Sequence, residues 1–145
     1  MANRYYTQFR YSLEKAVVDL FGFVTFGALG APTLSAVKSK GIKSITRTGA
    51  GAYDIVLGTG SAMDVYNALL NVDFCFKNAT APAAPLMYVV SETVATPSTG
   101  KISVQFTNAA GVATDPGNGE IVYLNVQLKN KIGRASCRER VYVLV

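Results

Sequence analysis

The sequence contains no histidine, and this absence excludes several kinds of active site. Histidine is a common general base and zinc ligand, so neither a Ser-His-Asp nor a Cys-His arrangement is available. The acidic residues before position 131 are scattered one per predicted strand or turn, which does not favour the facing carboxylates of a glycosidase. We therefore expect a protein that is not an enzyme and that binds no cofactor or metal. The carboxylates are Glu14, Asp19, Asp54, Asp64, Asp73, Glu92, Asp115 and Glu120.

Three glycine-containing segments resemble ligand-binding loops only superficially. Gly49-Ala50-Gly51 and Gly58-Thr59-Gly60 lack the following Lys-Ser/Thr of a phosphate loop and a strand-loop-helix unit. The segment from Asp115 to Glu120 lacks the alternating carboxylates of a calcium loop. All three are predicted to be turns, for which glycine supplies the positive φ.

Charged residues are also few, at 16% of the chain, whereas 50% of the residues are hydrophobic. This composition excludes intrinsic disorder, which requires many charges and little hydrophobicity. It favours a chain that buries surface against partner chains as well as in its own core. With 145 residues, the chain is long enough for one domain.

The two cysteines and the net charge of +5 both depend on the last residues of the chain. Residues 132–141 read IGRASCRERV, which ATCGGAAGAGCGTCGTGTAGGGAAAGAGTG encodes. We identify that DNA as a common sequencing adapter and expect residues 131–145 to be an artefactual tail. Without this tail, ten basic and eight acidic residues remain, a net charge of +2. Cys75 is then the single cysteine, which fits synthesis in a reducing cytoplasm.

A membrane span is not expected from this sequence. No early apolar run resembles a secretion signal, and the stretch from Ala16 to Val37 is interrupted by Asp19, Pro32 and several glycines. A spanning helix needs about 20 unbroken apolar residues. We interpret the stretch as strands and a turn.

Alternation of apolar and polar residues predicts an all-β fold. It is clearest at Val72–Phe76, Ile102–Phe106 and Val122–Leu128, where every second residue is apolar and so faces a core. A hairpin is predicted across residues 48–51, and one short helix near 62–69 because Ser61 and Asp64 resemble a capping box. We predict a single antiparallel β-sandwich of jelly-roll type over residues 1–130, with an N-terminal arm at 1–15.

Two features bear on partners. The segment Val17–Phe26 is apolar on both faces, which fits a strand between its own core and a neighbouring molecule. The basic residues of the segment 38–47 have no interleaved aromatic residues, so we expect a solvated face or a subunit contact and no nucleic acid. These basic residues are Lys38, Lys40, Lys43 and Arg47.

Several blocks of the chain resemble small virion proteins of tailed bacteriophages. The blocks are residues 26–58 (with the pattern G-APTL, GI-SITR and Y-I-L), Asp64–Leu70 (D-YNALL), and Asp115 with Gly119–Leu124 (D-GE-VYL). The resemblance implies a β-sandwich that assembles in many copies on a capsid or tail. It implies no catalytic residues.

From the resemblance and the aromatic residues we predict a capsid decoration or cementing protein, made in the bacterial host cytoplasm and located in the virion. It would bind the major capsid protein and neighbouring copies, as a homotrimer. The alternative is a receptor-binding module of a fibre or tail that uses the loops 58–64 and 108–119; an acid-pair hydrolase is the third hypothesis. The predicted interface residues are Tyr5, Tyr6, Phe9 and Tyr11 of the arm, with Phe21 and Phe23 of the following strand.

Overall fold

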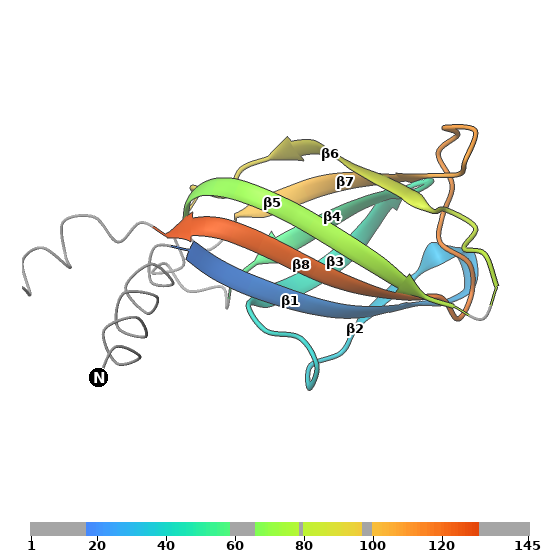
Figure 1. Cartoon of the computed structure of the whole chain (residues 1–145), viewed down its shortest axis with the longest axis horizontal. Helices are drawn as coiled ribbons and strands as arrows, with labels where there is room; N and C mark the ends of the chain where they lie inside the picture. The colour runs from blue at the N-terminus through green and yellow to red at the C-terminus, as the bar shows by residue number, and fades with distance from the viewer. Residues whose placement is uncertain (1–16, 59–65, 79, 97–99, 131–145) are drawn as a thin grey trace, which may run out of the picture.

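The computed structural model shows an all-β protein of two packed sheets (Figure 1). It describes residues 17–58, 66–78, 80–96 and 100–130. The elements are β1 (Val17–Phe26), a 3₁₀ turn (Ala28–Gly30), β2 (Pro32–Leu34), β3 (Ile42–Gly49), β4 (Ala52–Leu57), β5 (Tyr66–Lys77), β6 (Leu86–Glu92), β7 (Lys101–Thr107) and β8 (Ile121–Asn130). In the described part of the chain, no helix is long and apolar enough to cross a membrane.

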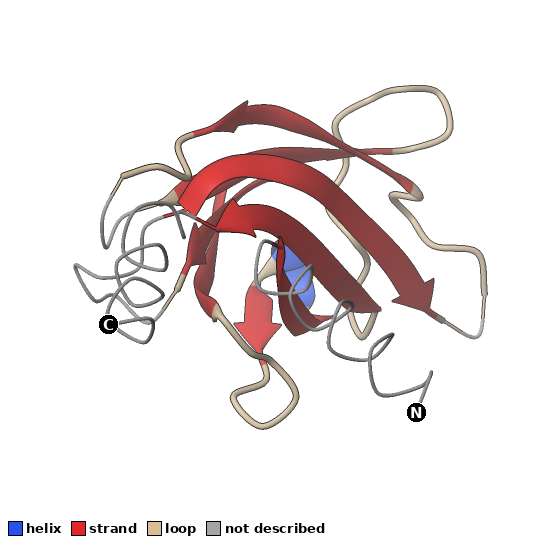
Figure 2. Cartoon of the chain, turned by 60° about the vertical axis from the view of Figure 1, so that its left-hand side comes forward, coloured by secondary structure: helices blue, strands red, loops and turns tan. Residues whose placement is uncertain are grey.

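Each sheet has four strands, and every pair of neighbouring strands is antiparallel. The first sheet has the order β2-β1-β8-β5, and the second has the order β3-β4-β7-β6. Figure 2 shows the two sheets as stacked layers, which is the packing of a β-sandwich. The predicted antiparallel β-sandwich is therefore confirmed.

The core lies between the two sheets and follows the predicted alternation. In β8, Val122, Val126 and Leu128 are fully buried, and in β7 Ile102 and Val104 are at most 1% exposed. Residues between them point to the outer faces, because successive side chains of a strand point to opposite sides. At one end of the core the rings of Phe26, Tyr53 and Phe106 pack edge to face, with centroids 5.4–5.9 Å apart.

The predicted hairpin is confirmed, and the predicted helix is wrong. β3 pairs with β4 across the turn, with Arg47 opposite Tyr53. Residues 66–69 are the beginning of β5, and they pair with the end of β8; residues 62–65 lie outside the described residues. β5 forms strand because Tyr66 and Leu69 pack against the core from it, which outweighs the weak capping signal.

β1 buries only its inner face against the described chain. Leu20, Val24 and Phe26 are buried, whereas Phe21 on the outer face is 47% exposed. The apolar residues that made both faces of this strand hydrophobic in the sequence thus divide into a core set and a surface set. The exposed residues of β1 form part of the candidate site described below.

Candidate interaction surface

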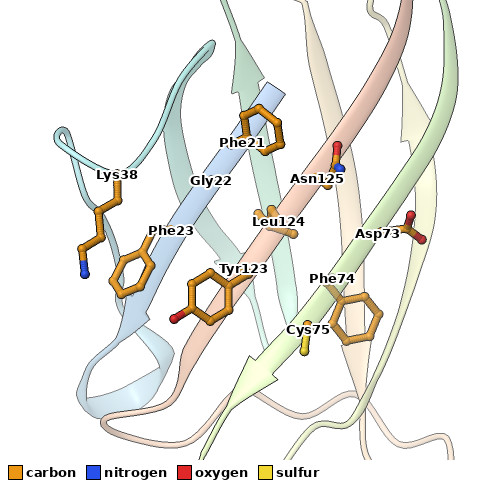
Figure 3. Close-up of a pocket in the computed structure, with 10 residues that line it drawn as sticks. All are labelled: Phe21, Gly22, Phe23, Lys38, Asp73, Phe74, Cys75, Tyr123, Leu124 and Asn125. Carbon is orange, nitrogen blue, oxygen red and sulfur yellow. The ribbon is translucent and has the colours of Figure 1, made fainter. Parts of the chain in front are cut away.

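Three aromatic side chains lie together on the outer face of the first sheet (Figure 3). Phe21 and Phe23 come from β1, and Tyr123 comes from the adjacent strand β8. The antiparallel register places Phe23 opposite Tyr123, and Phe21 lies two residues along β1, on the same face. We call these three residues the aromatic surface.

The aromatic surface is held by contacts among its own members and one lysine. The rings of Phe23 and Tyr123 meet edge to face with their centroids 5.2 Å apart. Lys38 Nζ, from the loop after β2, lies 4.4 Å from the centroid of Phe23, a cation–π contact. Tyr123 remains 44% exposed. The surface therefore combines ordered rings with a large area open to a partner.

A shallow groove of about 450 Å³ runs over this face from β1 to β5. Its polar side follows the next row of the sheet, in which Phe21, Asn125 and Asp73 lie side by side on β1, β8 and β5. Asn71 Nδ2 donates to Asp73 Oδ2 at 2.7 Å. Asn125 Oδ1 is buried and has no hydrogen-bond partner within the described residues. The aromatic surface thus lies beside two polar side chains, Asn125 and Asp73, that can accept hydrogen bonds.

The outer face of the second sheet differs, because its centre is polar. Asp54 on β4 accepts a hydrogen bond from Ser103 Oγ at 2.6 Å and pairs with Lys101 Nζ at 2.9 Å, both on β7. The hydrogen bond from Ser103, followed by that from Lys101, lowers the pKa of Asp54 below its usual value. These groups satisfy one another across the two central strands of this sheet.

Asp115 binds three segments of the fold to one another. Its carboxylate accepts two hydrogen bonds from the Arg47 guanidinium, at 3.0 and 2.8 Å. It also accepts from the Gly51 N–H at 2.8 Å and from the Tyr53 hydroxyl at 3.0 Å. The hydrogen bonds from Arg47 are the main reason that the pKa of Asp115 is lowered, and burial is the main reason that the pKa of Tyr53 is raised.

Glu120 is a buried carboxylate, 6% exposed, that binds two loops. Its Oε1 accepts from Asn78 Nδ2 at 3.0 Å and from the Ala83 N–H at 2.8 Å, and its Oε2 accepts from the Gly117 N–H at 2.8 Å. The segment from Asp115 to Glu120 is therefore a turn, as predicted. Its two carboxylates bind backbone groups of the protein itself.

Three of the carboxylates have structural roles within the fold. Asp54, Asp115 and Glu120 each hold neighbouring strands or loops, and none faces another carboxylate in a cleft. In the described parts of the chain, no cluster of three or more Cys, Asp or Glu side chains could hold a metal ion. The rings of Phe21 and Tyr123, in contrast, remain about half exposed on the first sheet.

The structure brings together two of the predicted interface residues, Phe21 and Phe23. Tyr5, Tyr6, Phe9 and Tyr11 lie outside the described residues. Sequence reasoning missed Tyr123, and it named Lys38 only within the basic segment expected to be a solvated face or a subunit contact. The alternation around Tyr123 already placed it on an outer face, but only the pairing of β8 with β1 shows which residues lie beside it.

The structure also locates the basic residues and the loop 108–119, which the sequence marked as possible contacts with partners. Of the basic residues, Lys38 covers Phe23 and Arg47 is paired with Asp115. The loop 108–119 is ordered by Asn108 Oδ1, which accepts from the N–H groups of Ala110 and Val112. Most of the loop 58–64 lies outside the described residues.

Comparison of the chain with protein-family models, curated proteins and solved structures finds no match in any of the three.

Proposed function

We propose that this chain is a structural subunit of a bacteriophage particle, a capsid decoration protein that binds the major capsid protein and neighbouring copies of itself. The aromatic surface is the observation that carries the proposal. Two half-exposed rings, Phe21 and Tyr123, lie on an ordered sheet face beside Phe23. Aromatic residues are enriched at protein interfaces because each buries a large area with little loss of side-chain freedom.

The rest of the fold fits a binding role on a particle. A sandwich whose polar groups are engaged within its own loops presents a stiff face to a neighbour, so little order has to be gained on binding. The blocks that resemble phage virion proteins, among them D-GE-VYL, contain Asp115, Glu120 and Tyr123. In the proposed homotrimer the aromatic surface contacts the shell or the adjacent subunit.

Replacing both Phe21 and Tyr123 with serine is expected to lower the occupancy of the protein on particles at least about tenfold, because two hot-spot rings are removed. Purified particles lacking the protein would be mixed with each variant, sedimented, and assayed for bound protein. Val112→Ser is the matched control, since Val112 is 58% exposed in a loop away from this face. Full occupancy by the double variant would contradict the role of the aromatic surface.

Deleting residues 1–15 is expected to abolish binding to particles while the sandwich stays folded, because the predicted arm ends before β1 begins at Val17. Sedimentation with particles measures binding, and thermal unfolding checks the fold. An arm-deleted protein that coats particles at full occupancy would remove the arm from the proposed interface.

The number of copies per particle separates a decoration protein from a receptor-binding module. Quantitative mass spectrometry of purified virions is expected to find hundreds of copies, in a fixed ratio to the major capsid protein. A few copies per particle would instead favour a fibre or tail module.

A further inference from the structure

The strand β6 forms an open edge of the second sheet and is apolar along its whole central part. It pairs with β7 on one side only. Four of its side chains are substantially exposed, namely Leu86 (51%), Tyr88 (54%), Val89 (39%) and Val90 (60%). An open edge presents unpaired backbone N–H and C=O groups, which bind another extended strand unless the edge is protected.

The other three edge strands carry more protection than β6. β2 is only three residues long. β3 carries Lys43 and Arg47 and has register shifts near both ends, and β5 carries Asp73 and Lys77 together with two register shifts. Charge, shortness and bulges are the usual means by which an edge avoids pairing. β6 has no charged residue before Glu92 and a single register shift, between Val89 and Ser91.

The hydrogen bonds of β7 show which backbone groups of β6 are free. The Phe106 N–H donates to the Gly51 carbonyl, on the β4 side of β7. Residues 105 and 107 therefore face β6, where they lie opposite Tyr88 and Leu86. It follows that Tyr88 and Leu86 direct their backbone groups to β7, while Met87 and Val89 direct theirs to the open edge. Within the described chain, no backbone bond from Met87 or Val89 to a further strand is present.

We propose that β6 pairs with β6 of a second copy, antiparallel, about a two-fold axis that passes between the two Tyr88 residues. Met87 of each copy then exchanges both backbone hydrogen bonds with Val89 of the other, which uses the four free backbone groups of these two residues in each strand. Tyr88 lies opposite Tyr88 of the second copy, and the regular pairing ends before Val90, where the register of β6 shifts. The second sheet becomes continuous across the pair.

We choose a second copy as the partner because the residues on either side of Tyr88 are apolar in both directions along β6. Met87 and Val89 lie on either side of Tyr88 and both are apolar, so self-pairing places an apolar residue opposite an apolar residue in the regular part of the strand. Aromatic and β-branched cross-strand pairs of this kind stabilise a sheet. The contact lies on the second sheet, away from the aromatic surface, and it goes beyond the proposed function. On a particle it would join copies that belong to neighbouring oligomers.

Disulfide cross-linking tests both the pairing and its register. In a full-length chain with Cys75→Ser and Cys137→Ser, a Tyr88→Cys change places two thiols on opposing positions without ladder bonds, where Cα atoms are about 4.5 Å apart and a disulfide fits. We expect rapid formation of a cross-linked dimer under mild oxidation. Leu86→Cys alone is expected to remain uncross-linked, because residue 86 lies about 13 Å along the strand from its own copy. Absence of the Tyr88→Cys dimer, or equal cross-linking by Leu86→Cys alone, would overturn the proposal.

Light scattering on the unmodified chain gives an independent measurement. Tyr88→Lys would place two like charges opposite each other across the two-fold axis, so it should weaken the pair about tenfold or more. The mass of the wild-type species is then expected to be at least twice that of Tyr88→Lys at the same concentration. Thr46→Lys, on the charged edge β3, is the matched control and should keep the wild-type mass. Equal masses for wild type and Tyr88→Lys, both folded by circular dichroism, would refute β6 pairing without bearing on the aromatic surface.

Discussion

Replacement of Glu120 with alanine is expected to lower the free energy of unfolding by about 3 kcal/mol, because three donors lose a charged acceptor in a buried site. Two of these donors are the backbone N–H groups of Ala83 and Gly117, which have no other acceptor among their described contacts. The third is the Asn78 side chain. The loop before β6 and the turn before β8 should loosen together, since one side chain binds both.

Thermal unfolding and urea titration of the purified variant measure this loss, and a fall in Tm of roughly 10 °C corresponds to it. Glu120→Gln is the informative control. Its amide keeps one oxygen but turns an N–H group toward either Gly117 or the Ala83–Asn78 pair, so it should recover only part of the stability. A Glu120→Ala protein as stable as wild type would show that these loops hold their positions without the carboxylate.

Replacement of Asp115 with alanine is expected to lower the free energy of unfolding by about 2–3 kcal/mol, because the Gly51 N–H loses its acceptor and Arg47 loses its partner. This is the second largest loss of stability that we expect. Tyr53 keeps its hydrogen bond to the Gly30 carbonyl at 2.8 Å, which limits the damage. Asp115→Asn retains one oxygen for Gly51 but loses the paired contact with Arg47, so its loss should be about half as large. An alanine variant with wild-type urea stability would contradict the role of Asp115 in joining these segments.

The contribution of Asp115 to the free energy of unfolding should also depend on pH. Its pKa in the folded protein lies below its ordinary value of about 4, mainly because of the hydrogen bonds from Arg47. The stability that the ionised carboxylate adds is then fully present above about pH 4 and is lost as the pH falls through the folded-state pKa. The difference in unfolding free energy between wild type and Asp115→Asn should therefore narrow below about pH 4. Asp54 titrates in both proteins and cancels in the comparison.

The sandwich itself could be predicted because its strands obey a simple rule. In β7 and β8 every second residue is apolar, and those residues are the buried ones, such as Ile102, Val104, Val122 and Val126. The hairpin across residues 48–51 could be predicted from the glycine-containing turn between two strand-like segments. Where one face is buried and the register is regular, alternation in the sequence is enough to assign a strand.

The start of β5 could not be predicted because bulges change the spacing of its inward residues. Register shifts between Tyr66 and Ala68 and between Leu69 and Asn71 each insert one residue. The residues that pack on the core are consequently Tyr66, Leu69 and Val72, three apart. A spacing of three is what a helix face also shows, so the sequence indicated a helix in a segment that is strand.

Only the part of the candidate site on β1 could be predicted from the sequence, and the reason is different. Phe21 and Phe23 could be assigned to an outward face because β1 had more apolar residues than one face of a core requires. Tyr123 and Asn125 belong to the same surface only because β8 lies beside β1. Pairing between the first and last strands depends on the topology of the whole domain, which local patterns do not encode.

Because β8 is the last strand of the chain and lies in the middle of the first sheet, this sheet can be completed only at the end of synthesis. β8 lies between β1 and β5, and Val17 at the start of β1 is opposite Lys129 near its end. During synthesis, β1 and β5 therefore leave the ribosome before β8, the strand that lies between them. Until β8 is made, β1 and β5 lack the strand with which both pair, so the incomplete chain exposes unpaired strand edges and is most prone to aggregation or chaperone binding.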